Sequence, residues 1–171
     1  RDQPRSRGLG DVYKRQVSRF GQRLTGPGGF INLTQATRKV VFCGTFVGKA
    51  KCRVGEGHIT IEQEGTIRKF RRHVEQITFS GRYIRPDQEV LYVTERCVFR
   101  LEDGKMTIIE VAPGISIERD ILPHMDFVPV ISPAVRTMDE RLFCESWGAL
   151  GETIRKGTVS YTHLRAHETE A

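Results

Sequence analysis

The feature that most constrains the fold of this chain is a series of short segments rich in β-branched and aromatic residues, separated by turns. Lys39–Phe46 is a nearly continuous apolar run, as is typical of a buried strand. His58–Gln63 and Thr66–Arg72 alternate apolar and polar positions on either side of Glu64-Gly65, which predicts a β-hairpin with one solvated face. Further strands are predicted at Gln76–Ser80, Val90–Thr94, Cys97–Leu101 and Met106–Val111, with a turn at Glu102–Lys105 between the last two.

Helical patterns are fewer and shorter. Ile31–Arg38, which follows a glycine-rich stretch, is one predicted helix. Ser116 is a candidate N-cap of a second helix that reaches Met125, and Pro123 predicts that this helix is short or distorted. Val128–Pro133 is predicted to be extended. No apolar run approaches the roughly 20 residues that a membrane-spanning helix needs, so no membrane partner is expected.

The two ends of the chain share an unusual relation. Ser6–Gln16 and Val159–Thr169 can be encoded by opposite strands of one DNA sequence, which resembles the transposase end and adapter used to fragment DNA for sequencing. Residues 1–16 and 158–171 are therefore expected to be adapter-encoded and are left out of the fold prediction. Residues 17–157 are expected to be an internal stretch of a longer gene, with enough chain for one domain.

Without the two ends, residues 17–157 hold 21 of the 27 basic and 17 of the 21 acidic side chains. Their net charge of +4 is a mild surplus that suits a nucleic-acid partner or an anionic ligand without establishing either. Arg68–His73 is the densest basic cluster, and Phe70 is the one aromatic residue in it. Two interpretations stay open: a basic nucleic-acid-binding module, or the solvated face of a hairpin. The four cysteines form no CxxC pair, so no metal site is predicted. Cys43 and Cys97 lie in apolar runs and are expected to be small buried residues.

Several stretches, in collinear order over nearly all of residues 17–157, carry a family resemblance. The stretch Val17–Leu33, which contains Gly-Pro-Gly-Gly-Phe-Ile-Asn, is similar to one in class I CoA-transferases, most of all the single-chain type that acts on acetate, propionate and other short acyl groups. The similarity continues through Lys39–Phe46, Val74–Gly81, Glu89–Arg100, Ile109–Gly114, Glu118–Leu122, Met125–Phe127 and Ile131–Pro133.

The resemblance implies an α/β fold: residues 17–157 would be the C-terminal part of an open α/β/α CoA-transferase domain, with a central mixed sheet and a hairpin-rich edge. It further implies a cytoplasmic homo-oligomeric parent whose partners are an acyl-CoA and a short carboxylic acid. The coenzyme A thioester would be a substrate, and no bound cofactor, metal or nucleic acid is expected. A hydrolase of the same fold, in which water resolves the intermediate, remains an alternative.

In this family a glutamate carboxylate attacks the thioester, which is covalent catalysis. The nucleophile lies in a Glu-Ser-Gly context upstream of the glycine loop, so no catalytic residue is assigned within this chain. Glu145-Ser146 is followed by Trp147 in an unrelated context, and Glu95 is expected to lie in a connection between strands. The resemblance implies a substrate loop at the acyl site that comprises Gly26, Gly28, Gly29, Phe30 and Asn32. The alternative is an ordinary loop whose glycines permit a tight bend before a helix.

Overall fold

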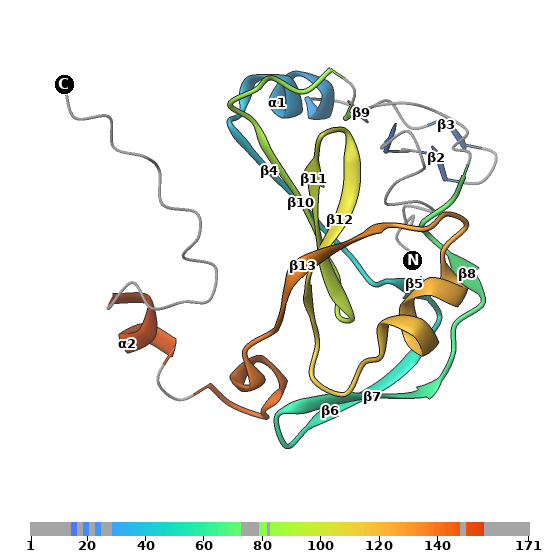
Figure 1. Ribbon diagram of the computed structural model, residues 1–171, viewed down its shortest axis with the longest axis vertical. Helices are drawn as coiled ribbons and strands as arrows, with labels where there is room; N and C mark the ends of the chain where they lie inside the picture. The colour runs from blue at the N-terminus through green and yellow to red at the C-terminus, as the bar shows by residue number, and fades with distance from the viewer. Residues whose placement is uncertain are drawn as a thin grey trace.

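The computed structural model describes residues 15–16, 19–20, 23–24, 29–72, 79–81, 83–147 and 150–155. Its centre is a mixed five-stranded sheet in the order β13-β12-β11-β10-β4 (Figure 1). β10, β11 and β12 form an antiparallel meander, while β4 and β13 add parallel strands at the two edges. The strands are β4 (Lys39–Cys43), β10 (Glu89–Val93), β11 (Cys97–Glu102), β12 (Lys105–Val111) and β13 (Val130–Thr137). The predicted strands in these segments are confirmed, and β13 extends the predicted Val128–Pro133 segment.

Both faces of the sheet are packed, because successive strand residues point to opposite sides. On one face, Tyr92 of β10 and Phe99 of β11 join a core cluster with Phe42, Phe46 and Phe70. On the other face, Leu91, Val98 and Ile109 join a second cluster with Ile59 and Phe143. The Phe70 ring centroid lies 5.0 Å from those of both Phe46 and Phe99, so one residue of the predicted basic cluster is a central core residue.

The predicted hairpin of His58–Gln63 with Thr66–Arg72 is wrong. β7 (His58–Gln63) pairs instead with β6 (Lys51–Gly55), and β8 (Ile67–Arg68) pairs with β5 (Val47–Gly48). The true turn is Glu56-Gly57, whose φ angles of 52° and 79° are both positive. Two positive φ angles are what a two-residue type I′ hairpin turn requires, and this hairpin lies at the end of the sheet opposite α1 (Figure 1).

The helical segments follow the predictions closely. α1 (Phe30–Ala36) confirms the first predicted helix. In the second, the Ser116 hydroxyl accepts a hydrogen bond from the Arg119 N–H, and a π-helical turn, η1 (Ile117–Ile121), is followed by a 3₁₀ turn, η2 (Leu122–His124). Pro123 lies in this 3₁₀ turn, so the expected distortion is confirmed. The later turns are η3 (Glu140–Phe143) and the six-residue helix α2 (Leu150–Arg155).

Short strands complete the described chain. β1 (Arg15–Gln16) pairs with β9 (Phe79–Ser80), and β2 (Arg19–Phe20) pairs with β3 (Arg23–Leu24). The predicted strand Gln76–Ser80 lies partly outside the described residues, and β9 is its described end. No helix within the described ranges has both the length and the apolar character needed to cross a membrane.

The expectation of a buried Cys43 is wrong, whereas Cys97 is buried as expected. β4 is an edge strand in which Val40 and Phe42 face the core, so the alternating residues Val41 and Cys43 face outward. Val41 is 46% exposed. The apolar run of β4 therefore has one covered face rather than two.

Gly114 fixes how the β6–β7 hairpin packs on the segment after β12. Its φ is +92°, and an added Cβ would lie 2.4 Å from the Ile59 carbonyl oxygen. The Ile59 N–H donates to the Pro113 carbonyl at 3.0 Å, so the neighbouring backbone has little freedom to move. We expect Gly114→Ala to lower the free energy of unfolding by about 2 kcal/mol or more, measured by urea denaturation.

Gly55→Ala is the matched control, because an added Cβ at Gly55 meets no heavy atom within 4 Å. Equal stability losses in the two variants would contradict this account of the Gly114 contact.

Candidate functional site

Of the three glycines in the predicted loop, Gly29 is described, whereas Gly26 and Gly28 lie outside the described residues. Gly29 is the N-cap of α1 with φ −75°, so it does not use the positive φ that glycine permits. Among the described residues, an added Cβ would meet only Leu33 Cδ1, at the ordinary contact distance of 3.8 Å. Neither backbone strain nor crowding by the described residues therefore requires a glycine here.

The structure separates the other two residues of the predicted loop. Phe30 is partly buried and its ring lies 5.9 Å from that of Phe42, which places it against the core. Asn32 is exposed on the outer surface of α1. Phe30 therefore anchors α1 to the sheet, and Asn32 does not share its surroundings.

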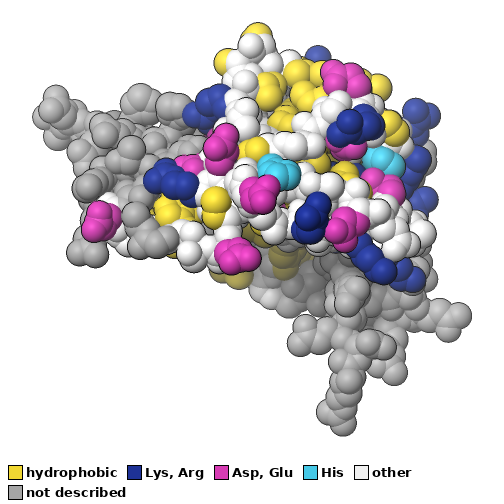
Figure 2. Space-filling view, turned by 90° about the horizontal axis from the view of Figure 1, so that it is seen from below, with side chains coloured by type: hydrophobic (Ala, Val, Ile, Leu, Met, Phe, Trp, Pro, Cys, Tyr) yellow, Lys and Arg dark blue, Asp and Glu magenta, His cyan; other side chains and the backbone are white. Residues whose placement is uncertain are grey.

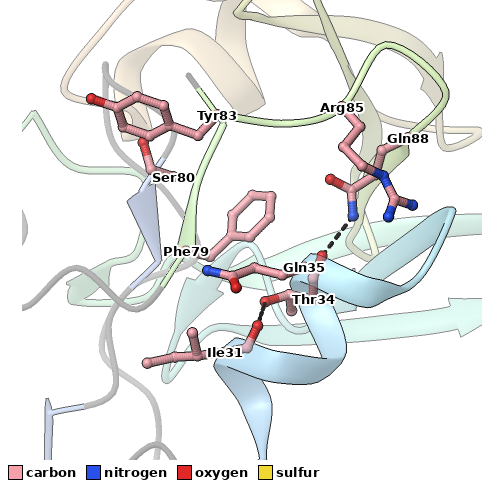
Figure 3. A pocket seen from close by; sticks show the side chains of 8 residues that line it. All are labelled: Ile31, Thr34, Gln35, Phe79, Ser80, Tyr83, Arg85 and Gln88. Carbon is pink, nitrogen blue, oxygen red and sulfur yellow. Dashed lines mark hydrogen bonds between the residues drawn. The ribbon is translucent and has the colours of Figure 1, made fainter.

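A cavity of about 480 Å³ lies beside α1, bounded by β9 and by the segment that leads into β10 (Figure 3). α1 contributes Ile31, Thr34 and Gln35, and the facing wall includes Phe79, Tyr83 and Arg85. Phe79 is buried, whereas the Tyr83 side chain is 86% exposed at the rim. The cavity thus has an apolar floor and an aromatic edge.

Hydrogen bonds to the carbonyl groups at the end of α1 hold the cavity walls together. The buried Gln88 amide donates to the carbonyls of Thr34 at 2.6 Å and Thr37 at 2.7 Å. Arg85 Nη2 lies 3.5 Å from the carbonyl oxygens of Ala36 and Thr37. These side chains satisfy carbonyls that a helix end leaves without an internal partner.

No local sequence pattern predicts this cavity. Its two walls come from segments about fifty residues apart in the sequence, as the Thr34–Gln88 and Thr37–Gln88 hydrogen bonds show. The available signals were the predicted strand Gln76–Ser80 and the similarity of Val74–Gly81 to the family, and neither placed this segment beside α1.

A second polar group lies at the opposite end of the sheet, around the fully buried Arg96. Its guanidinium donates two hydrogen bonds to the Glu64 carboxylate, at 2.9 and 2.8 Å, and a third to the Asp120 carbonyl at 2.7 Å. It also lies 5.2 Å from the centre of the Phe46 ring. His124 Nε2 is 3.1 Å from Glu64 Oε2, the oxygen that also accepts from Arg96 Nη1. Arg96 therefore joins the β10–β11 connection to the β7–β8 turn and to η1 and η2.

Glu95, as expected, lies in the connection between β10 and β11, and its carboxylate accepts a hydrogen bond from the Phe46 N–H at 2.7 Å. Burial raises the pKa of Glu95, and the Phe46 hydrogen bond offsets only part of this effect. Burial acts on Glu64 in the same direction, but the hydrogen bonds from Arg96 and the Gly65 N–H prevail and lower its pKa. Burial also raises the pKa of the Cys97 thiol, which is therefore protonated and a poor nucleophile.

The predicted basic cluster is largely paired within the fold. Arg68 and Arg71 lie 3.2 and 3.6 Å from the Asp126 carboxylate, and Phe70 is fully buried. Phe70 thus cannot stack on a nucleic-acid base. On the face shown in Figure 2, basic and acidic side chains are interspersed rather than gathered by sign. In the described part of the chain, no three His, Cys, Asp or Glu side chains are grouped so that they could hold a metal ion.

Arg96→Met tests the buried ion pair. The substitution leaves the Glu64 carboxylate without its bidentate partner, and the Glu64 side chain is only one-third exposed. We expect a loss of about 3 kcal/mol in the free energy of unfolding, measured by urea denaturation. Arg53→Met, which removes a largely exposed ion pair with Glu62, should cost less than about 1 kcal/mol. A loss of the same size in both variants would argue against a special role for Arg96.

Glu95→Gln tests the buried carboxylate through pH. The pKa of Glu95 is raised in the folded state, so below the unfolded pKa of about 4.3 its carboxyl group is protonated and does not lower the free energy of unfolding. As the pH rises through the folded pKa, ionisation of the buried carboxyl lowers the free energy of unfolding. We therefore expect the stability of Glu95→Gln relative to the wild type to increase over this rise in pH, measured by urea unfolding between about pH 4 and pH 8. Parallel stability curves for the two proteins would contradict the assignment.

Glu64→Gln is the opposite case. The lowered pKa of Glu64 stabilises the fold above its unfolded pKa, and this contribution is lost as pH falls through the folded pKa. The loss of stability in Glu64→Gln should therefore be largest at neutral pH and shrink as the pH falls below about 4.

Known proteins place this fold and sequence in one family. No protein-family model matches the chain. The chain is 51% identical over 147 residues to the caffeate CoA-transferase of Acetobacterium woodii, a match that covers 85% of this chain and 28% of that protein. It is 43% identical over 132 residues to the acetate CoA-transferase YdiF of Escherichia coli O157:H7, covering 76% of this chain and 25% of that protein.

The structure also superposes on a crystal structure of acyl-CoA transferase YdiF from Escherichia coli O157:H7 in a thioester complex with CoA. The TM-score is 0.74 at 42% identity, and the match covers 80% of this chain and 27% of that one. The chain thus spans about a quarter of the length of these relatives. The mixed sheet agrees with the predicted α/β fold, and the chain belongs to the class I CoA-transferase family.

Proposed function

We propose that residues 17–157 are the C-terminal part of an enzyme that transfers coenzyme A from an acyl-CoA to a carboxylic acid. The 51% identity to a caffeate CoA-transferase carries this proposal, and the superposition on YdiF supports it. As part of the same proposal, residues 1–16 and 158–171 are adapter-encoded, and the parent is a cytoplasmic homo-oligomer.

The proposed chemistry requires a glutamate nucleophile outside residues 17–157. Its carboxylate attacks the thioester carbonyl and expels the CoA thiolate, which leaves an acyl-glutamyl anhydride. The thiolate then attacks the glutamyl carbonyl, which gives a glutamyl-CoA thioester and releases the first carboxylate. An acceptor carboxylate reverses both steps. By itself, a chain without this glutamate is expected to transfer no CoA.

The contribution of this chain is the loop that leads into α1. We propose that Gly26, Gly28 and Gly29 border the acyl group, so that backbone can approach the reacting carbonyl closely. Backbone N–H groups at such a position stabilise the oxyanion of each tetrahedral intermediate, and one donor is worth about 3–4 kcal/mol in related acyl chemistry. The low crowding of Gly29 by the described residues is consistent with this role. Phe30 would act indirectly, because its packing on Phe42 fixes the start of α1.

One named relative is a caffeate CoA-transferase and the other is an acetate CoA-transferase. The acid in the first name is aromatic, and the acid in the second is small. We propose an acyl-CoA and a carboxylic acid as the substrates, with acetate and propionate among the candidates. Hydrolysis of the thioester by the same fold is distinguished by its products, since it releases free CoA in the absence of an acceptor acid. The alternative of a nucleic-acid-binding module is weakened, because Phe70, the aromatic residue that would stack on a base, is buried.

Gly29→Ala tests the substrate loop in the enzyme encoded by the gene extended upstream of Val17. The added Cβ meets only Leu33 Cδ1 at 3.8 Å, so the fold should be undisturbed. It would nevertheless occupy the space that the acyl group needs, and a displacement of the reacting groups by about 1 Å can cost about 10²-fold in rate. We expect a loss of that order in kcat/KM for CoA transfer, with an unchanged melting temperature.

Gly55→Ala in the same enzyme is the control and should keep full activity, because its added Cβ lies in open space on the β6–β7 hairpin. Unchanged turnover in Gly29→Ala would remove Gly29 from the acyl site. An extended enzyme with no transfer activity towards any acceptor acid would overturn the proposed function itself.

A further inference from the structure

The cavity beside α1 is larger than a short acyl group needs. Its volume of about 480 Å³ lies within the range of about 300–1,000 Å³ that is typical of pockets for ligands of drug size. An acetyl or propionyl group would leave most of it unfilled. Its size therefore suits a ligand that carries a ring.

The chemistry of the walls favours an apolar, planar ligand. Ile31 and the buried Phe79 supply carbon surface, and the Tyr83 ring stands exposed at the rim (Figure 3). Two of the polar wall side chains, Thr34 and Gln88, are already engaged in the fold. Thr34 Oγ1 donates to the carbonyls of Phe30 or Ile31, and the Gln88 amide donates to those of Thr34 and Thr37. An aromatic ring can pack against Phe79 and Tyr83.

The charge at the rim is weakly positive. Arg85 Nε lies 3.2 Å from the Asp87 carboxylate and Arg38 Nε lies 3.8 Å from it, so two guanidinium groups share one carboxylate. All three side chains are substantially exposed, so the attraction for an anion is modest and screened by salt. The rim tolerates a carboxylate, while the apolar walls supply most of the affinity.

The cavity is also well placed relative to the proposed acyl site. Ile31, in its wall, belongs to the first turn of α1, directly after Gly29 at the N-cap. A group that reacts beside Gly29 could therefore extend its tail along α1 towards Phe79 and Tyr83. From this placement we infer that the cavity between α1, β9 and residues 83–88 binds the aromatic part of an arylalkanoic acid or its acyl-CoA, and sets a preference for aromatic over short aliphatic acids. This inference rests on the proposed function.

A matched pair of probes tests it directly on the 171-residue chain. 3-Phenylpropanoate and propanoate share their carboxylate and differ by one phenyl ring. We expect 3-phenylpropanoate to bind at least about tenfold more tightly, measured by NMR titration, because burial of a ring of that size is worth more than a factor of ten in affinity. Equal binding of the two probes, or no binding of 3-phenylpropanoate, would overturn the inference.

Two variants locate the binding site. Gln35→Trp places an indole at the exposed helix position that borders the cavity and should abolish the preference for 3-phenylpropanoate. Leu33→Trp, on the same helix at a position that is 66% exposed and outside the cavity wall, should retain it. Tyr83→Ala removes a ring that is 86% exposed, so the fold should tolerate it, and affinity should fall about threefold or more. An undiminished preference in both Gln35→Trp and Tyr83→Ala would place the ring elsewhere and overturn the inference.

Binding needs no nucleophile, so its outcome is independent of catalysis. Absence of ring-dependent binding together with CoA transfer by the upstream-extended enzyme would overturn the inference and leave the proposed function intact. Ring-dependent binding without any CoA transfer would instead overturn the proposed function.

Discussion

The buried guanidinium of Arg96 is the interaction on which the arrangement around the sheet depends. A fully buried positive charge is tolerated only when it is paired and its donors are satisfied. The two terminal nitrogens of Arg96 meet this need with the Glu64 carboxylate and the Asp120 carbonyl. Its Nε has no hydrogen-bond partner among the described residues and lies 3.6 Å from Glu95 Oε1, and the guanidinium faces the Phe46 ring. These partners come from segments that are far apart in the sequence, so the network fixes the β7–β8 turn and the η1–η2 segment against the central sheet. Apolar packing alone is less directional and would allow these segments to shift.

The two ends of the parallel β4–β10 pair have different roles. Glu95 and Arg96 follow the carboxyl end of β10, where the Phe46 N–H, just after β4, also donates to Glu95. Ligands of open α/β sheets commonly bind beyond the carboxyl ends of strands, but in this chain that region is filled by buried ion pairs. The cavity lies instead near the amino ends, where α1 leads into β4 and Gln88 precedes β10. The stabilising network and the candidate binding surface are thus separated by the length of the sheet (Figure 1).

The candidate site shows where prediction from sequence succeeds and where it stops. The similarity of Val17–Leu33 to the family drew attention to the glycine loop, and α1 does begin there. Yet two of its described residues do not converge, because Phe30 packs on Phe42 while Asn32 faces outward. The opposite wall, from Phe79 to Gln88, has no local pattern that connects it with α1. Its position follows from hydrogen bonds across more than fifty residues, which no periodicity records.

By itself, the sequence determined the strand-rich class, the segments of β10, β11 and β12 with the hairpin turn between the last two, and the helix after the glycines. Side-chain alternation, turn residues and caps act over a few neighbouring positions, so local sequence suffices for these features. It also determined the family, through similarity that is collinear over nearly the whole stretch. Only the tertiary structure decided which strand pairs with β7, because Glu56-Gly57 and Glu64-Gly65 are both plausible turns from the local sequence. In the structure the hairpin turn is Glu56-Gly57, where both φ angles are positive, and β7 pairs with β6. The exposure of Cys43, the burial of Phe70 and the pairing of Arg96 with Glu64 were likewise decided there, because each depends on which segments meet in space.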